Sequence, residues 1–201
     1  MNRTLASAAL AAALLATGDL AAQRSDNSGF MLGAHLAGTS LGTTGRGAES
    51  RSGGGAGIKL GYGFNERIAL FLGLDGANLR HREGEGSGDT FAAASVDLGA
   101  RVNFGNPSHA LRPYLTATTT AVGLSDNVPM FDTMAEAQTV GGGLNVGIGT
   151  QYFLRRRLAL DAAFLVTTGS FTEVKVDGTT TEIPGVSFEY GRVQLGVTWH
   201  P

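Results

Sequence analysis

The chain has 201 residues, a formal net charge of −2 and no cysteine. The near-neutral charge gives no electrostatic basis for binding nucleic acid. The lack of cysteine excludes disulfides, thiol catalysis, cysteine metal sites and a lipidated N-terminal cysteine. Glycine is frequent, with 31 residues, and only 16% of the residues are charged, which is typical of many short strands joined by glycine-rich turns.

The start of the chain has the pattern of a secretory signal peptide. A positive residue comes first, and residues 5–16 form an apolar, alanine-rich run that is too short to cross a membrane as a helix. Cleavage could follow Ala22 or Gly18, because small residues precede both. No later segment reaches the roughly 18 apolar residues of a membrane-spanning helix. We therefore expect a cleaved signal peptide (1–22) and one exported domain (23–201).

Alternation of apolar with small or polar residues at a period of two predicts eight strands. In chain order they cover residues 29–41, 56–64, 68–75, 91–104, 114–124, 141–152, 158–166 and 190–199. The connections are long after the first, third, fifth and seventh strands and short after the second, fourth and sixth. Outer-membrane barrels have short periplasmic turns and longer outer loops, so this asymmetry places both chain ends in the periplasm.

The alternation is clearest over residues 141–166, where a polar knot at 155–157 separates two strands. One face of both strands is continuously apolar, and the other mixes glycine with polar side chains. This fits a barrel with lipid outside and a polar interior. In the third strand the same pattern points Leu70, Leu72 and Leu74 outward, whereas a soluble barrel with an apolar ligand inside would point them inward.

The long connections are predicted to be loops, among them residues 42–55, 125–138 and 171–188. Within the last of these, residues 174–179 alternate and offer an extension of the final hairpin beyond the membrane. The exposed edge of such an extension would accept a strand from a partner protein.

Seven aromatic residues fall at strand ends beside the short turns or the chain termini. They are Phe30, Tyr62, Phe64, Phe104, Tyr114, Tyr152 and Trp199. Core aromatics of a soluble sheet would scatter along the strands instead. We therefore expect these seven to form an outward-facing belt at one membrane interface.

Six charged residues fall on the inward face of the predicted barrel, three of each sign. They are Lys59, Asp75, Asp97, Arg101, Asp161 and Arg192. An eight-stranded barrel is just wide enough for side chains to fill, and an unpaired charge there would be costly. We therefore expect a buried network of ion pairs, joined by Asn103, Asn145, Gln151 and Gln194. Such a network closes the lumen, which favours structural filling over the alternative of a narrow, gated ion path.

The four histidines give no basis for catalysis or metal binding. His35 lies on the inward face, His81 in a loop, His109 in a short turn and His200 near the end of the chain. A catalytic triad needs a histidine with a serine and a carboxylate, and no His-x-Ser spacing occurs. Metal-ligand spacing is also missing. We therefore predict no catalytic, cofactor-binding or metal-binding residues.

The pattern resembles the small eight-stranded outer-membrane barrels, the OmpA/OmpX-like and opacity-protein-like outer membrane protein beta-barrel domain family. The leader, the strand opening at 112–115, the strand at 141–152, the strand opening at 157–161 and the apolar last strand carry the resemblance. It implies an all-β, eight-stranded antiparallel up-and-down transmembrane barrel in the bacterial outer membrane. The family usually ends on an aromatic residue that the assembly machinery reads. This sequence departs from that pattern, because His200 and Pro201 follow Trp199.

We expect a structural or surface-interaction role for such a barrel, with a lumen filled by side chains. Its partners would be outer-membrane lipid, the outer-membrane assembly machinery and an extracellular protein bound through the loops. The alternatives are a narrow gated channel and a soluble, lipocalin-like binder of an apolar ligand.

Overall fold

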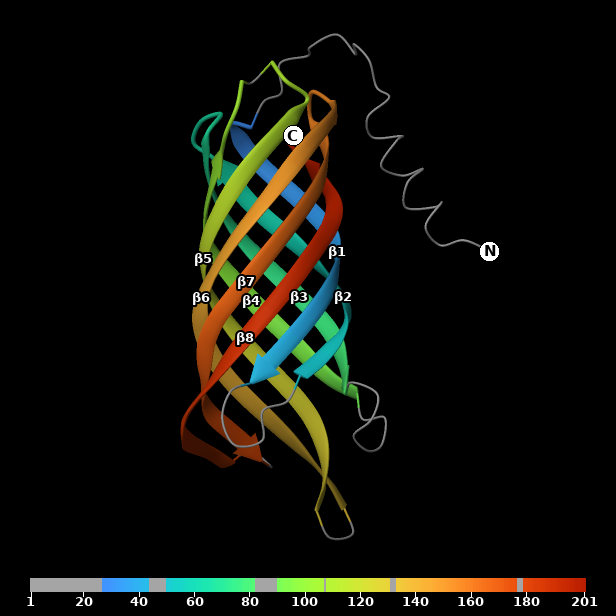
Figure 1. The fold of residues 1–201 in the computed structure, drawn as a ribbon, viewed down its shortest axis with the longest axis vertical. Helices are drawn as coiled ribbons and strands as arrows, with labels where there is room; N and C mark the ends of the chain where they lie inside the picture. Colours follow the sequence, from blue (N-terminus) through green and yellow to red (C-terminus); the bar gives the residue numbers. More distant parts are fainter. Residues whose placement is uncertain (1–26, 44–49, 82–89, 107, 131–132, 177–178) are drawn as a thin grey trace, which may run out of the picture.

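The computed structural model describes residues 27–43, 50–81, 90–106, 108–130, 133–176 and 179–201. Eight antiparallel strands pair in chain order and close into one barrel (Figure 1). They are β1 (Gly29–Thr43), β2 (Ser50–Gly63), β3 (Ile68–His81), β4 (Thr90–Asn103), β5 (Leu111–Met130), β6 (Thr133–Arg155), β7 (Leu158–Val176) and β8 (Thr179–Trp199). Among the described residues, no helix is long and apolar enough to span a membrane. The predicted eight-stranded, antiparallel barrel is confirmed, whereas the predicted signal peptide (1–22) lies outside the described residues.

The short connections lie at one end of the barrel, which we call the turn end, and the C-terminus lies there too (Figure 1). The opposite end is the loop end. In the β2–β3 connection, Asn65 Oδ1 accepts hydrogen bonds from the backbone N–H groups of Arg67 (2.8 Å) and Ile68 (2.9 Å). In the β4–β5 connection, Gly105 has a φ of +89°, which glycine adopts without strain. Local turn chemistry therefore makes these reversals tight.

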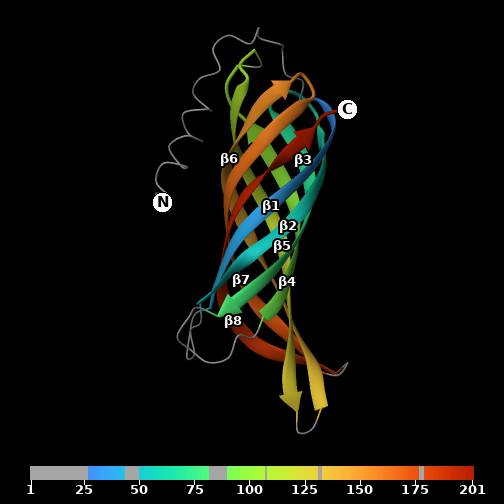
Figure 2. The ribbon, with the colours of Figure 1, turned by 90° about the vertical axis from the view of Figure 1, so that its right-hand side faces the viewer.

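Several strands continue farther toward the loop end than the sequence predicts. β2 begins at Ser50 instead of residue 56, and most of the predicted loops at 125–138 and 171–188 belong to strands. The hairpin of β5 and β6 projects farthest (Figure 2). A strand needs only about 9–11 residues to cross a bilayer, and β6 has 23. In this projecting part the sequence loses its alternation, while the backbone ladder continues.

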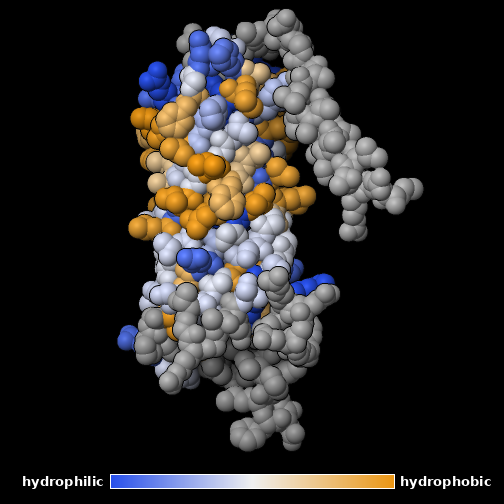
Figure 3. Space-filling model, viewed as in Figure 1, coloured by the Kyte–Doolittle hydropathy of each residue, from blue (hydrophilic) through white to orange (hydrophobic). Residues whose placement is uncertain are grey.

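Large apolar side chains cover the outside of the barrel in a band next to the turn end (Figure 3). We call this surface the apolar band. Its most exposed members include Leu36, Leu98, Leu144, Val146 and Leu195. Leu70, Leu72 and Leu74 also point outward, with exposed fractions of 47%, 38% and 42%. This is the direction predicted for a lipid-facing wall and the opposite of what an apolar ligand cavity would need.

Toward the loop end the barrel reverses the chemistry of its two faces. An apolar cluster fills the interior there, and we call it the loop-end cluster. It consists of Leu41, Leu79, Phe91, Ala93, Val122, Phe171, Phe188 and Tyr190. The outward neighbours on these strands are exposed and polar, such as Ser40, Asn78 and Glu189. This part has the cross-section of a water-soluble barrel, so its own core supports it outside the bilayer.

Candidate functional site

Arg192 of β8 lies at the centre of the charged lumen and is fully buried. Its Nη1 donates to Asp97 Oδ2 (2.6 Å) and its Nη2 to Asp97 Oδ1 (3.0 Å), so the guanidinium grips this carboxylate at two points. The same Nη1 lies 3.1 Å from both Asp75 Oδ2 and Ser95 Oγ. One arginine thus pairs with two carboxylates from β3 and β4, which suits a planar group with five donors.

Asp75 connects this arginine to three further side chains. His35 Nε2 lies 2.6 Å from Asp75 Oδ1, and Gln194 Nε2 donates to the same oxygen at 3.0 Å. Lys59 Nζ donates to Gln194 Oε1 at 2.7 Å. No carboxylate in the described part of the chain lies within ion-pair distance of Lys59. Lys59 therefore joins the network through an amide and not through the direct ion pair that the sequence predicts.

A second cluster, nearer the turn end, surrounds Asp161 of β7. Tyr114 Oη donates to Asp161 Oδ1 (2.6 Å), and Gln151 Nε2 donates to Asp161 Oδ2 (3.0 Å). Arg101 Nη1 lies 3.8 Å from Asp161 Oδ2, which is a long ion pair, and its Nη2 contacts Met31 Sδ at 3.1 Å. Neutral donors therefore satisfy most of this carboxylate, and the lumen charges form two clusters instead of one.

Tyr114 does not belong to the aromatic belt, so its predicted outward position is wrong. Its side chain is 4% exposed and points into the lumen. β5 begins at Leu111 and alternates from there, with Pro113 and Leu115 outward, so Tyr114 faces inward. Gly149 lies directly opposite on β6 and makes room, because a Cβ at that position would overlap the tyrosine ring.

Replacing Tyr114 by phenylalanine removes only the hydroxyl group that donates to Asp161. We expect the free energy of unfolding to fall by about 1.5–3 kcal/mol, the range for a hydrogen bond to a charged group. Urea unfolding in lipid vesicles, followed by gel mobility of unheated samples, would measure it. Tyr62→Phe is the matched control because Tyr62 lies on the outer surface. Equal losses in the two variants would contradict a role for the Asp161 contact.

Only some of the four amide side chains predicted to join the network bind its charged groups. The two glutamines bind carboxylates as described above. Asn145 Nδ2 lies 3.5 Å from Asp97 Oδ1, at the limit of hydrogen bonding. Asn103 Nδ2 donates instead to the backbone oxygen of Glu66 at 3.4 Å, at the turn end. The network also includes groups that the predicted network left out, namely His35, Ser95, Tyr114, Thr120 and Thr198. All of them occupy inward positions of their strands, which is the signal that the sequence offers.

A separate set of contacts closes the lumen at the turn end. Arg112 Nη2 donates to Glu66 Oε2 at 3.0 Å. The Arg112 guanidinium lies 5.8 Å from the centre of the Phe153 ring, and that ring lies 5.7 Å from the His200 ring. His200 is buried, and its backbone N–H donates to the oxygen of Arg157 at 2.8 Å. The residue that follows the last aromatic position therefore packs into this closure.

The other predicted belt residues lie on the outer surface near the turn end. Phe30, Tyr62, Phe64, Phe104 and Trp199 are 45–63% exposed, and Tyr152 is partly exposed. The ring centres of Phe30 and Tyr62 are 5.3 Å apart, and those of Tyr62 and Phe64 are 5.6 Å apart, both edge to face. Amphipathic rings in such a position suit the interface between lipid and water.

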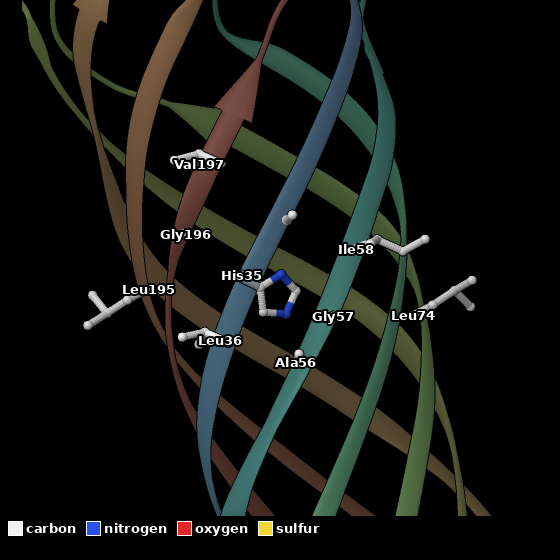
Figure 4. A pocket seen from close by; sticks show the side chains of 10 residues that line it. His35, Leu36, Ala56, Gly57, Ile58, Leu74, Leu195, Gly196 and Val197 are labelled. Carbon is white, nitrogen blue, oxygen red and sulfur yellow. The ribbon is translucent and has the colours of Figure 1, made fainter.

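His35 occupies a gap between two glycines on neighbouring strands. Figure 4 shows its ring on β1 between Gly57 of β2 and Gly196 of β8, its direct partners in the two ladders. A Cβ on Gly57 would lie 2.6 Å from His35 Nε2, and a Cβ on Gly196 would overlap the backbone oxygen of Ala34. With Ala56, these glycines also leave a shallow hollow in the apolar band outside. They therefore set how closely β1 approaches its neighbours.

The paired charges of the lumen suit a structural filling. The predicted six residues include three of each sign, and both clusters are buried inside the apolar band. Within the described ranges, no group of three or more histidine, aspartate or glutamate side chains could hold a metal ion. The arrangement can neutralise buried charge and brace the strands across the lumen.

Comparison with known proteins agrees with this architecture. The model of the family described as "Outer membrane protein beta-barrel domain" matches residues 7–200. Neisserial surface protein A has a similar structure, with a TM-score of 0.58 and 22% identity over 86% of this chain and 97% of that one. No curated protein sequence matches the chain.

Two further solved structures share the fold. The attachment invasion locus protein Ail of Yersinia pestis has a TM-score of 0.54 and 16% identity over 86% of this chain and 98% of its own. OprG of Pseudomonas aeruginosa has a TM-score of 0.56 and 11% identity over 88% of this chain and 97% of its own. Because the family match covers nearly the whole chain, the protein belongs to the outer membrane protein beta-barrel domain family and is a protein of the bacterial outer membrane.

Proposed function

We propose that the protein is a surface-interaction barrel. Its apolar band anchors it in the outer membrane, its turn end faces the periplasm, and its loop end meets molecules outside the cell. The observation that carries this proposal is the extension of β5–β8 beyond the rest of the barrel (Figures 1 and 2). Insertion by the outer-membrane assembly machinery, with Trp199 as the aromatic position that is read, is part of the proposal.

The extension is a four-stranded sheet, and no described strand pairs with its two outer edges. β1 pairs with β8 only as far as Phe188, and β4 pairs with β5 only as far as Ser125. Beyond these points the ladders between β5, β6, β7 and β8 continue, ending at Met130↔Thr133 and Val176↔Thr179. We call residues 126–130, 133–137, 171–176 and 179–187 the projecting sheet. In the proposed orientation its paired strands lie outside the bilayer, where an extracellular partner has access.

Recognition is proposed to use the faces and connections of the projecting sheet and not its edges. The predicted strand capture over 174–179 requires a free edge there, but β7 is paired on both sides up to Val176. The outer edges of the described sheet belong to β5 and β8, which contain Pro129 and Pro184. Proline has no N–H to donate to an added strand, and it is a common means of protecting an edge.

Two comparisons support the class of role. Ail is named for attachment and invasion, and one of its structures, with a TM-score of 0.52 to this chain, contains the heparin analogue sucrose octasulfate. A sulfated polysaccharide is therefore a reasonable first ligand to test. The identities are low, so these relatives suggest the kind of partner and not the residues that would bind it.

A narrow gated channel has less support than surface interaction. The two charged clusters occupy the lumen inside the apolar band, and the loop-end cluster adds an apolar layer between them and the loop end. An apolar constriction opposes the passage of water and ions. We also propose that the protein has no catalytic activity. The pair of His35 and Asp75 is buried inside this filled lumen, where a substrate would not reach it. A soluble binder of an apolar ligand loses its basis, since the leucines of β3 face outward.

Shortening the projecting sheet tests the proposal. Ser125 and Gln138 lie directly opposite each other, so an Asn-Gly turn in place of residues 126–137 can close the hairpin. We expect the shortened protein to keep its heat-modifiable gel mobility and to lose most of the binding of intact cells to immobilised heparin and matrix proteins. Arg67→Gln, at the turn end, should leave binding unchanged. Unchanged binding after shortening, together with ion conductance in planar bilayers, would favour the channel instead.

A further inference from the structure

Three consecutive arginines lie at the end of β6 and in the turn that leads to β7. Arg155, Arg156 and Arg157 are all exposed at the turn end of the barrel. In the portion of the chain that the structure describes, no carboxylate lies within ion-pair distance of any of them. The three guanidinium groups are therefore exposed at the turn end without an ion-pair partner among the described residues. This concentrates positive charge at one turn.

The turn lies at the boundary of the apolar band. Leu154, the residue just before the arginines, points outward and is 46% exposed. Leu158, just after them, pairs with Trp199 on β8, and the backbone oxygen of Arg157 accepts the N–H of His200. Trp199 itself is half exposed on the outer surface. The arginines are thus held beside an interfacial tryptophan, at the depth where lipid headgroups meet water.

Among the described residues, the net charge of the turn end is positive. Its described charged residues are Glu66, Arg67, Arg112, Arg155, Arg156 and Arg157. Glu66 is paired with Arg112, so the exposed charge on this rim is positive. A positive rim next to an apolar band favours anionic headgroups over zwitterionic ones.

We propose that Arg155–Arg157 and Trp199 form a docking surface for the phosphate headgroup of an anionic phospholipid. Guanidinium groups donate paired hydrogen bonds that match phosphate oxygens. The tryptophan would lie at the glycerol level, and the acyl chains would lie along the outward side chains of β6–β8, such as Leu154 and Leu160. We call Arg155–Arg157 and Trp199 the lipid rim. The proposal does not depend on what the loop end binds.

The protein contains its own reporter, because Trp199 is its only tryptophan. The full chain would be refolded into phosphatidylcholine vesicles that contain either phosphatidylglycerol or phosphatidylcholine with brominated acyl chains. Bromine quenches tryptophan on contact, so the quenching gives the relative association of each lipid with the lipid rim. We expect a preference of at least about threefold for phosphatidylglycerol, since each basic side chain near an anionic surface adds attraction. The variant R155Q/R156Q/R157Q should lower this ratio to about one.

Arg67→Gln is the matched control. Arg67 lies in the β2–β3 turn, on the opposite side of the barrel from β6–β7 in strand order, so this variant should keep the full preference. Heat-modifiable gel mobility would show that every variant is folded. Equal quenching by both lipids in the wild type, or a preference that survives the triple substitution, would overturn the proposal. So would loss of the preference in inorganic phosphate at constant ionic strength, because the arginines would then bind free phosphate. Binding of the wild type to peptidoglycan, with no lipid preference, would also overturn it.

Discussion

Replacing Arg192 by methionine is expected to lower the free energy of unfolding by about 3–5 kcal/mol, the cost of breaking a buried ion pair on one side. The substitution keeps the apolar stem and removes the guanidinium that donates to Asp97 and Asp75. Two carboxylates would then face each other inside the lumen without their common counter-charge. Urea unfolding in lipid vesicles, read by the gel mobility of unheated samples, gives the midpoint and the slope from which this loss is obtained.

Two further variants separate a lost ion pair from lost packing. Arg67→Met removes an exposed arginine at the turn end and should change the stability by less than about 0.5 kcal/mol. The combination of Arg192→Met with Asp75→Asn and Asp97→Asn removes the stranded charges, so it should recover much of the loss. A single Arg192→Met variant as stable as Arg67→Met would show that the lumen network has no structural role.

The strand pattern predicts the fold well inside the apolar band and poorly outside it, because apolar residues change faces at the edge of the bilayer. On β3, Leu74 points outward to lipid and Leu79 points inward to the loop-end cluster. On β8 the same change separates Val193 from Phe188. An odd spacing between apolar residues interrupts a period of two, so the sequence suggests that the strand ends. In the structure the strand continues, and the surrounding solvent changes.

The candidate site is limited by a different kind of information. Alternation gives the face of each side chain, and this places Asp75, Asp97 and Arg192 inside the barrel. It does not give the partner, because the tilt of the strands decides which levels meet across the lumen. Lys59 illustrates this, since its ammonium reaches an amide from β8 and no described carboxylate. Tyr114 illustrates the cost of assigning one residue to the wrong face, because a shift of one residue in a strand exchanges its two faces.

Replacing Gly196 by alanine is expected to cost about 3 kcal/mol, the upper end of the usual range for overpacking. Gly196 lies opposite His35 at the seam where the first and last strands close the barrel. A Cβ there would overlap the backbone oxygen of Ala34 and lie 2.7 Å from the His35 Cα. Backbone atoms can move aside only by opening the β1–β8 ladder. The yield of heat-modifiable, folded protein after refolding into vesicles should therefore fall sharply.

Gly191→Ala provides the comparison within the same strand. The nearest atom to a Cβ at Gly191 is the backbone oxygen of Ser40, 3.9 Å away, which is ordinary contact. Both substitutions reduce the flexibility of the unfolded chain to the same extent, so their difference isolates the clash at the seam. If the two variants fold with equal yield, the spacing of β1 and β8 is not what requires glycine at this position. A loss confined to Gly196→Ala would identify barrel closure as the step that depends on it.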